Sequence, residues 1–96
     1  MMLRLLLPVL LLEPAVLRAA PPDLPGKIIF QQNCARCHGA NGRLGKNGAH
    51  DLTKSNLNAF GRTYLVTNGL GKMPAFGKKL TPTEVEQVVA YSITLR

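Results

Sequence analysis

The sequence predicts an all-α domain, and three observations support that prediction. Apolar residues recur at helical spacing in three segments, which begin near residues 23, 59 and 81. No segment after residue 20 alternates apolar and polar residues as a half-buried strand does. The intervening segments are rich in Gly, Asn, Lys and Pro and show no internal repeat, so we interpret them as the loops of one small domain.

A leader at residues 1–20 precedes this domain, which comprises residues 21–96. Arg4 comes before an apolar run of eight residues, and small residues close the leader at Ala19 and Ala20. This order is typical of a secretory signal peptide, so we expect export and cleavage after one of the two alanines. Because a spanning helix needs about 20 apolar residues, the run predicts no integral membrane span.

The first helix is predicted to begin at Asp23 or Leu24, with Asp23 as its cap. Gly26, Phe30 and Cys34 follow at four-residue spacing and therefore share one stripe of this helix. Cys37 lies close to the same stripe, one turn later. We expect the helix to deliver both cysteines to the interior.

A long irregular loop is predicted from Gly39 to Asn58, because apolar residues show no sustained period there. Compact domains seldom contain about twenty residues without regular structure unless the segment has a function. Wrapping around a flat cofactor would provide one, since the cofactor offers the loop an apolar surface. The side chains expected to face it are Leu44, Leu52 and Leu57.

Two further helices complete the domain. The second is predicted over Ala59–Asn68, with Gly69 as its stop. The third starts with a T-x-x-E capping box from Thr81 to Glu84, with Pro82 at the first helical position. Its buried face should consist of Val85, Val88, Val89, Ser92 and Leu95.

The domain is strongly basic, with ten basic and four acidic side chains in residues 21–96. Such a surface suits nucleic acid, an anionic membrane or an acidic protein, or it is simply solvated. Aromatic residues are few and no recognition-helix pattern is present, so we expect no nucleic-acid binding. No Ser–His–acid set or phosphate-binding glycine loop is evident, and we predict neither catalytic residues nor an enzyme.

The segment C-A-R-C-H at residues 34–38 fits C-x-x-C-H, the attachment signature of c-type haem. In this signature the two thiols form thioethers with the vinyl groups of the porphyrin, and the following imidazole binds the iron from one face. The sequence therefore predicts one haem c, held covalently by Cys34 and Cys37, with His38 as an axial ligand.

The cysteine pair also has four competing interpretations: a disulfide, a thioredoxin-like redox pair, a zinc site and a chance arrangement of buried residues. The last three do not account for His38 as well as haem attachment does. A bridge across two intervening residues closes too small a loop to stabilise the fold much. A thioredoxin motif belongs beside a βαβ unit, which this sequence lacks. Zinc would require His38 and His50 together with both cysteines, at a spacing that matches no zinc-finger pattern.

Met73 is predicted to supply the second axial ligand of the iron. It is the only methionine after the leader, and it lies in a loop of Gly, Lys and Pro where a core-filling methionine is unusual. His50 is the principal alternative, followed by Lys72, Lys78 and Lys79.

With these residues identified, nearly the whole domain resembles the class I monohaem cytochromes c, especially the small bacterial and photosynthetic carriers. In that family the first and last helices cross where a glycine and an aromatic residue meet another aromatic residue. Gly26, Phe30 and Tyr91 occupy the matching places. Residues 66–69 and 72–76 are similar to the family's segment around its axial methionine. The resemblance implies a small cytochrome c fold, with three main helices and long loops wrapped around one covalently bound haem.

The chain departs from this family at His50, where the family usually has a proline whose carbonyl accepts the proton of the proximal imidazole. His50 also has a backbone carbonyl, so the bond to His38 can persist. The loop nevertheless loses the fixed dihedral angle that proline provides.

The resemblance implies a soluble carrier that shuttles single electrons between redox protein partners. Exposed lysines are expected to steer brief contacts with acidic docking surfaces, and the candidates are Lys27, Lys72, Lys78 and Lys79. We expect a monomer or transient complexes in the periplasm, or in a thylakoid lumen for a photosynthetic source. The alternatives are a haem-containing subunit of a larger redox complex and a ligand-binding haem sensor.

Overall fold

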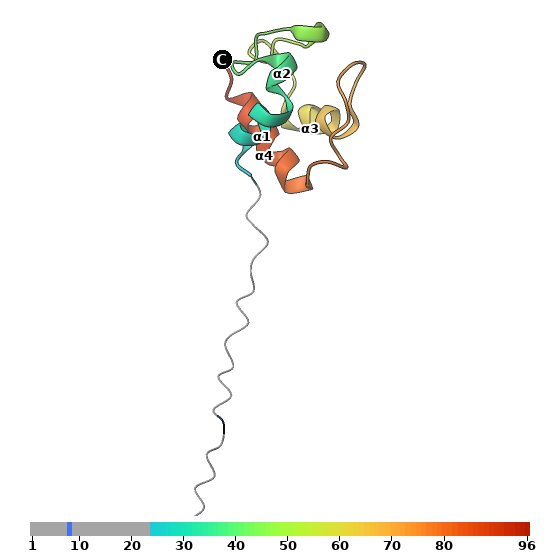
Figure 1. Ribbon diagram of the computed structural model, residues 1–96. Coiled ribbons are helices and arrows are strands. Elements are labelled where there is room, and N and C mark those ends of the chain that lie inside the picture. The colour runs from blue at the N-terminus through green and yellow to red at the C-terminus, as the bar shows by residue number, and fades with distance from the viewer. Residues whose placement is uncertain (1–7, 9–23) are drawn as a thin grey trace, which may run out of the picture.

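The computed structural model describes Pro8 and residues 24–96, so the expected signal peptide and its cleavage site lie outside the described part, apart from Pro8. Within that part the chain contains no strand, only an isolated bridge between Leu70 and Met73. The all-α prediction is confirmed. The helical elements are, in chain order, α1 (Gly26–Asn33), α2 (Ala35–His38), the 3₁₀ turn η1 (Lys46–Gly48), α3 (Ala59–Asn68) and α4 (Pro82–Ile93) (Figure 1).

Helices α1 and α4 cross in close contact, as the resemblance implied (Figure 1). A Cβ atom at Gly26 would lie 2.2 Å from the carbonyl oxygen of Gln87 and 3.0 Å from the Cβ of Tyr91. Only glycine lets the two backbones approach so closely. One turn later the rings of Phe30 and Tyr91 pack with their centroids 5.4 Å apart at an interplanar angle of 59°.

The start of α1 and the position of the cysteines differ from the prediction. The helix begins at Gly26 with Pro25 as its cap residue, and no side chain caps it. Asp23 lies outside the described residues. The helix ends at Asn33 because Cys34 turns to φ −113° and ψ −33°, and a separate turn of helix follows. The cysteines therefore lie at the junction with α2 and within α2, and not on a stripe of α1.

Helix α3 has the predicted bounds and ends at Gly69 as predicted, and α4 begins at Pro82 as predicted. The side chain of Asn58 accepts a hydrogen bond of 3.0 Å from the backbone N–H of Gly61 at the start of α3. At α4 the Thr81 hydroxyl accepts from the backbone N–H of Glu84 at 3.1 Å, and the Glu84 carboxylate accepts from the backbone N–H of Thr81 at 3.0 Å. The capping box predicted from the sequence is confirmed.

The apolar core of the described residues is small and lies where α1, α4 and the segment before α4 meet. Val85, Val88, Val89 and Ser92 are buried as predicted, whereas Leu95 is half-buried. The buried apolar side chains are Ile29, Phe30, Phe76, Leu80, Val85, Val88 and Val89. A domain of this size seldom obtains enough stability from so few buried side chains without a cofactor, metal or disulfide.

The segment between α2 and α3 is the long loop that the sequence predicts, interrupted only by η1. Figure 1 shows it on the side of the molecule where α2 lies, away from the start of α4. Within Pro8 and residues 24–96, none of the helices has the length and apolar character that crossing a membrane requires.

The crossing of α1 and α4 generates a stability prediction. Gly26→Ala should lower the free energy of unfolding of the haem-loaded protein by about 1–3 kcal/mol, because the added methyl group must push the two helices apart. Gly61→Ala is the matched control, since an added Cβ there meets the tip of the exposed Leu57 side chain at 3.2 Å. We expect it to be neutral or slightly stabilising. Denaturant unfolding of both variants measures the difference, and equal losses would contradict the close contact at Gly26.

Candidate functional site

A large cavity opens in the middle of the domain, with a volume of about 1330 Å³. Every helix, η1 and both long loops contribute side chains to its wall. Pockets for drug-sized ligands enclose about 300–1,000 Å³. The volume and the shared lining therefore fit one large group around which the whole chain is folded.

Cys34, Cys37 and His38 all line this cavity from α2 and its cap. The backbone N–H of Cys34 donates to the carbonyl of Phe30 at 2.8 Å, so the turn is anchored on the last turn of α1. The N–H of His38 in turn donates to the carbonyl of Cys34 at 3.0 Å. Both thiols are free and half-buried, and they face the same cavity as the imidazole. This is the arrangement that the C-x-x-C-H motif predicts.

The environment of Cys34 does not fit a thioredoxin-like redox pair. Burial raises the pKa of its thiol to about 11, against an opposing effect of the nearby Lys79. A reactive cysteine of that class needs a lowered pKa, because the thiolate is the nucleophile. Cys34 and Cys37 form no disulfide, and no three His, Cys, Asp or Glu side chains of the described residues gather as a metal site would require. The alternatives to haem attachment gain no support from the geometry.

The imidazole of His38 is oriented by a hydrogen bond of 3.0 Å between its Nδ1 and the backbone carbonyl of His50. A carbonyl oxygen can only accept, so Nδ1 carries the proton and Nε2 keeps its lone pair. The lone pair is what an iron ion needs from a histidine ligand. The hydrogen bond to His38 that His50 could still accept in place of the proline is therefore present.

Met73 reaches the cavity on the loop between α3 and α4. Its N–H donates to the carbonyl of Leu70 at 2.9 Å, and its own carbonyl accepts from the N–H of Leu70 at 3.0 Å. Gly69 makes this turn possible, since its φ is +74° and an added Cβ would lie 2.7 Å from the carbonyl oxygen of Met73. The methionine backbone is thus fixed at the end of α3.

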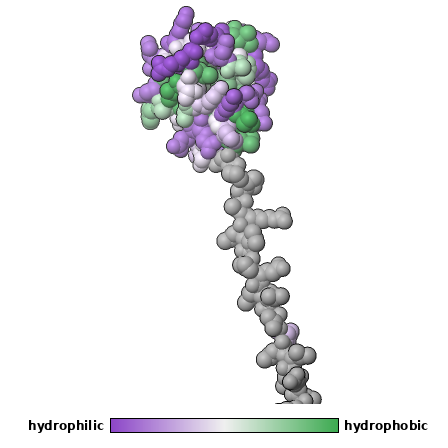
Figure 2. All heavy atoms as spheres, turned by 90° about the vertical axis from the view of Figure 1, so that its left-hand side faces the viewer, coloured by the Kyte–Doolittle hydropathy of each residue, from purple (hydrophilic) through white to green (hydrophobic). Residues whose placement is uncertain are grey.

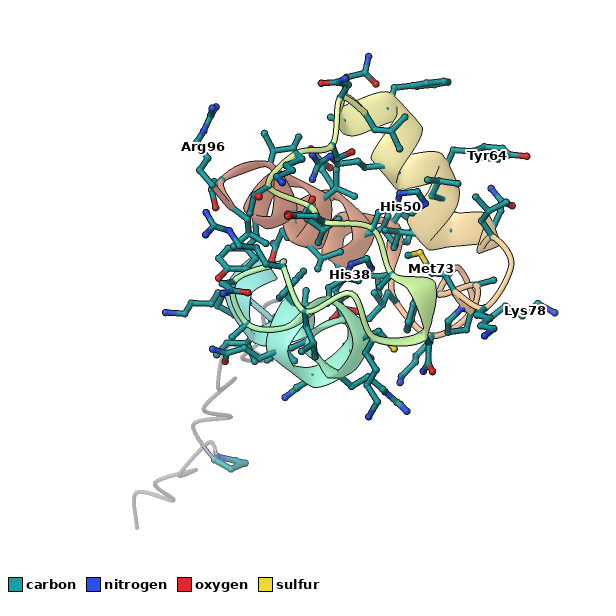
Figure 3. The ribbon with its side chains drawn as sticks, turned by 90° about the horizontal axis from the view of Figure 1, so that it is seen from above. His38, His50, Tyr64, Met73, Lys78 and Arg96 are labelled. Atoms are coloured by element: carbon teal, nitrogen blue, oxygen red, sulfur yellow. The ribbon has the colours of Figure 1, made fainter. Side chains whose placement is uncertain are left out.

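Two further hydrogen bonds connect the loop that contains Met73 to the end of α3. The N–H of Phe76 donates to the carbonyl of Val66 at 2.8 Å, and the N–H of Gly77 donates to the carbonyl of Thr67 at 3.1 Å. These bonds use carbonyls of the last helical turn, which would otherwise lack partners. In Figure 3 the side chains of His38 and Met73 both lie near the middle of the molecule, whereas Lys78 lies at its edge.

The alternative ligands differ in their positions. His50 is exposed and lines the cavity, and its carbonyl is already bonded to His38. Lys72 and Lys79 also line the cavity, and the ammonium group of Lys79 lies 5.8 Å from the centre of the buried Phe76 ring. Lys78 is exposed and does not contribute to the wall.

Sequence reasoning missed one contact of the cysteines and misplaced one leucine. The side-chain amide of Asn47 donates to the sulfur of Cys37 at 3.8 Å, from a backbone with φ +56°. The dipeptide Asn-Gly is a turn signal and was the available clue. Leu52 and Leu57 line the cavity as predicted, but Leu44 does not and is 59% exposed.

Arg62 was also missed. It is the one charged side chain of α3, it is buried, and it lines the cavity. Nothing in the sequence around it distinguishes it from the many arginines on helix surfaces.

Comparison with known proteins places the chain in a family. The family model described as cytochrome c oxidase, cbb3-type, subunit III matches residues 22–91. The chain is 43% identical over 72 residues to cytochrome c6 of Gloeothece citriformis, a match that covers 69% of this chain and 64% of that protein. It therefore spans slightly less than two thirds of that relative. With cytochrome c6 of Rippkaea orientalis it shares 42% identity over 82 residues, covering 74% of this chain and 73% of the relative.

One solved structure has a fold similar to that of this chain. The c-type cytochrome KustC0563 superimposes with a TM-score of 0.70 at 23% identity, covering 76% of this chain and 99% of that one. Residues 22–91, which the family model matches, contain the cysteine motif, the methionine loop and the crossed helices. The chain therefore belongs to the small class I c-type cytochromes, which contain one covalently attached haem.

Proposed function

We propose that this chain is a soluble electron carrier whose haem is attached to Cys34 and Cys37 and ligated by His38 and Met73. The observation that supports the proposal is that His38 and Met73 line one cavity from separate parts of the chain. His38 presents its Nε2 lone pair because Nδ1 is bonded to His50, and Met73 is fixed on a separate loop. The bound haem supplies an iron that changes between the ferrous and ferric states.

The protein residues have distinct roles in this proposal. The two cysteines hold the cofactor permanently, so the carrier does not lose it between partners. His38 and Met73 would hold the iron of the bound haem, which would leave no coordination position for a substrate. The thioether of Met73 is a soft ligand that favours the reduced form and raises the reduction potential.

Met73 is a better candidate than His50 for the second axial position. The carbonyl of His50 lies 3.0 Å from Nδ1 of His38, so His50 belongs to the wall on the side of the proximal ligand. The second ligand of the iron would have to come from a different part of the wall. Met73 comes from the loop that is tied to the end of α3, a separate part of the wall.

Electron transfer without substrate chemistry distinguishes this proposal from a haem enzyme or a gas sensor, both of which need an open coordination position. The subunit alternative keeps the same ligands and adds a permanent partner, as the description of the matching family suggests. Gel filtration of a native extract separates a free carrier from a subunit.

The proposed partners are redox proteins with acidic docking surfaces. Residues 24–96 contain ten basic and three acidic side chains, and Figure 2 shows hydrophilic residues over much of the face it presents. Lys72 and Lys79 line the cavity and are exposed. They therefore lie close to the proposed haem, through which electrons would enter and leave the protein. We further propose export to the periplasm or to a thylakoid lumen, after removal of residues 1–20.

The axial assignment is tested by paired substitutions. Met73→Ala should empty the sixth coordination position, so the reduction potential should fall and carbon monoxide should bind the reduced protein readily. His50→Ala is the control, since it keeps the backbone carbonyl that orients His38. It should change neither property.

Potentiometric titration and carbon monoxide difference spectra measure both effects. If His50→Ala altered the spectrum while Met73→Ala did not, the methionine assignment would be wrong. A wild-type protein that bound carbon monoxide avidly would favour sensing or catalysis over electron transfer.

The role of the lysines is tested with two small oxidants of opposite charge. Lys72→Glu should slow oxidation by ferricyanide and accelerate oxidation by a cationic cobalt(III) complex, each by up to about tenfold at low ionic strength. Added salt should reduce both effects because it screens the charges. Lys27→Glu, an equal charge change on α1 away from the cavity wall, is the control and should have a smaller effect. Equal effects of both variants would mean that electrons do not leave near Lys72.

A further inference from the structure

Arg62 is a buried cation on α3 with three polar partners. Its side chain is 8% exposed. Its Nε donates to the backbone carbonyl of Leu57 at 2.9 Å, and its Nη1 donates to the hydroxyl of Ser92 at 3.0 Å. A longer contact of 3.5 Å joins Nη2 to the carbonyl of Ser55. The guanidinium thus links the end of the long loop to α3 and α4.

All three of these acceptors are neutral. Burial lowers the pKa of Arg62, and no charged group offsets that effect. The carboxylate of Asp51 is bonded to Thr53 and interacts with the charges of Lys54 and Arg43, while that of Glu84 is used in the cap of α4. Glu86, the third acidic side chain of residues 24–96, is exposed and does not reach the cavity wall. The described residues therefore leave this cation uncompensated, and a buried charge without a counter-ion destabilises a fold strongly.

Arg62 is also part of the cavity wall. An arginine has five N–H donors in a planar fork that matches a carboxylate. The three contacts described use one N–H each and leave donors on both Nη atoms. The cavity is therefore positively charged at this point and suited to a carboxylate.

We infer that Arg62 binds a propionate carboxylate of the haem. The inference rests on the proposed function, because the haem brings two propionates into this cavity. Neighbouring arginine lowers the pKa of a carboxyl by about 1 to 3. Arg62 therefore keeps the propionate ionised and balances its charge next to the iron. Through Leu57 and Ser92 it also fixes the cofactor edge to the loop and to α4.

Other charged groups face the same cavity and must be separated from this effect. Helix α4 contributes none, since only Val88 and Ser92 reach the wall from it. The charged or titratable side chains on the remaining elements, apart from those that hold the haem, are Arg36, Lys46, His50, Asp51, Lys54, Lys72 and Lys79. A probe placed on the propionates themselves distinguishes their titration from that of His50 or Asp51.

The test uses the reduced, haem-loaded protein from cells fed with 5-aminolevulinate that carries ¹³C in its carboxyl group, which labels the propionate carboxyls. Their ¹³C NMR resonances are followed against pH. In the wild-type protein one propionate should titrate below the ordinary carboxyl value of about 4.3, and Arg62→Gln should raise its pKa by about 1 to 3. Lys54→Gln removes an exposed charge from the same wall and should leave that pKa nearly unchanged. Arg62→Lys, which keeps the charge, should give an intermediate value.

The outcomes separate the two proposals. If no labelled haem remains on the protein, the proposed function itself fails. If haem is attached but the propionates titrate alike in the wild type and in Arg62→Gln, Arg62 is only a structural link and the inference is overturned. Should Arg62→Gln not fold, the wild-type titration decides, because two propionates with ordinary or raised pKa values would contradict the ion pair.

Discussion

The central constraint on this molecule is a cavity of about 1330 Å³ in a domain whose described residues bury seven apolar side chains. Side chains from α1, α2, α3 and α4 all contribute to the cavity wall, so the group that fills it would contact every one of these helices. The loop from α2 to α3 has almost no regular structure of its own and gains its buried surface from the same group. Cofactor binding and folding are therefore closely linked in this chain.

The proposed ligation requires that His38 and Met73 be positioned before the iron binds them. His38 is held by the carbonyl of His50 at 3.0 Å, which leaves Nε2 free for the metal. The methionine loop is held by hydrogen bonds to the end of α3 and by a glycine at φ +74° that no residue with a side chain could replace without strain. The loop that contains His50 and the loop that contains Met73 thus both position a proposed ligand of the iron. Arg62 extends the same principle to the edge of the cofactor.

The sequence was most informative where a local pattern has one physical explanation. The capping box at Thr81, the helix stop at Gly69 and the contact of Gly26 with α4 were all predictable, because each depends on short-range spacing or on a family resemblance. The break of the first helix at Cys34 was not predictable, since periodicity continues through a kink. The outward position of Leu44 shows the same limit, because an irregular loop has no period that fixes the direction of a side chain. The burial of Arg62 depends on contacts with residues 55, 57 and 92, and no local pattern encodes them.

Covalent attachment of the haem is tested most directly by the mass of the natively expressed protein after denaturation, combined with titration of its thiols. We expect one haem retained per chain and no reactive thiol, because Cys34 and Cys37 are both consumed in thioether bonds. Haem that is extracted completely by acidified acetone, leaving two free thiols on each chain, would contradict covalent attachment.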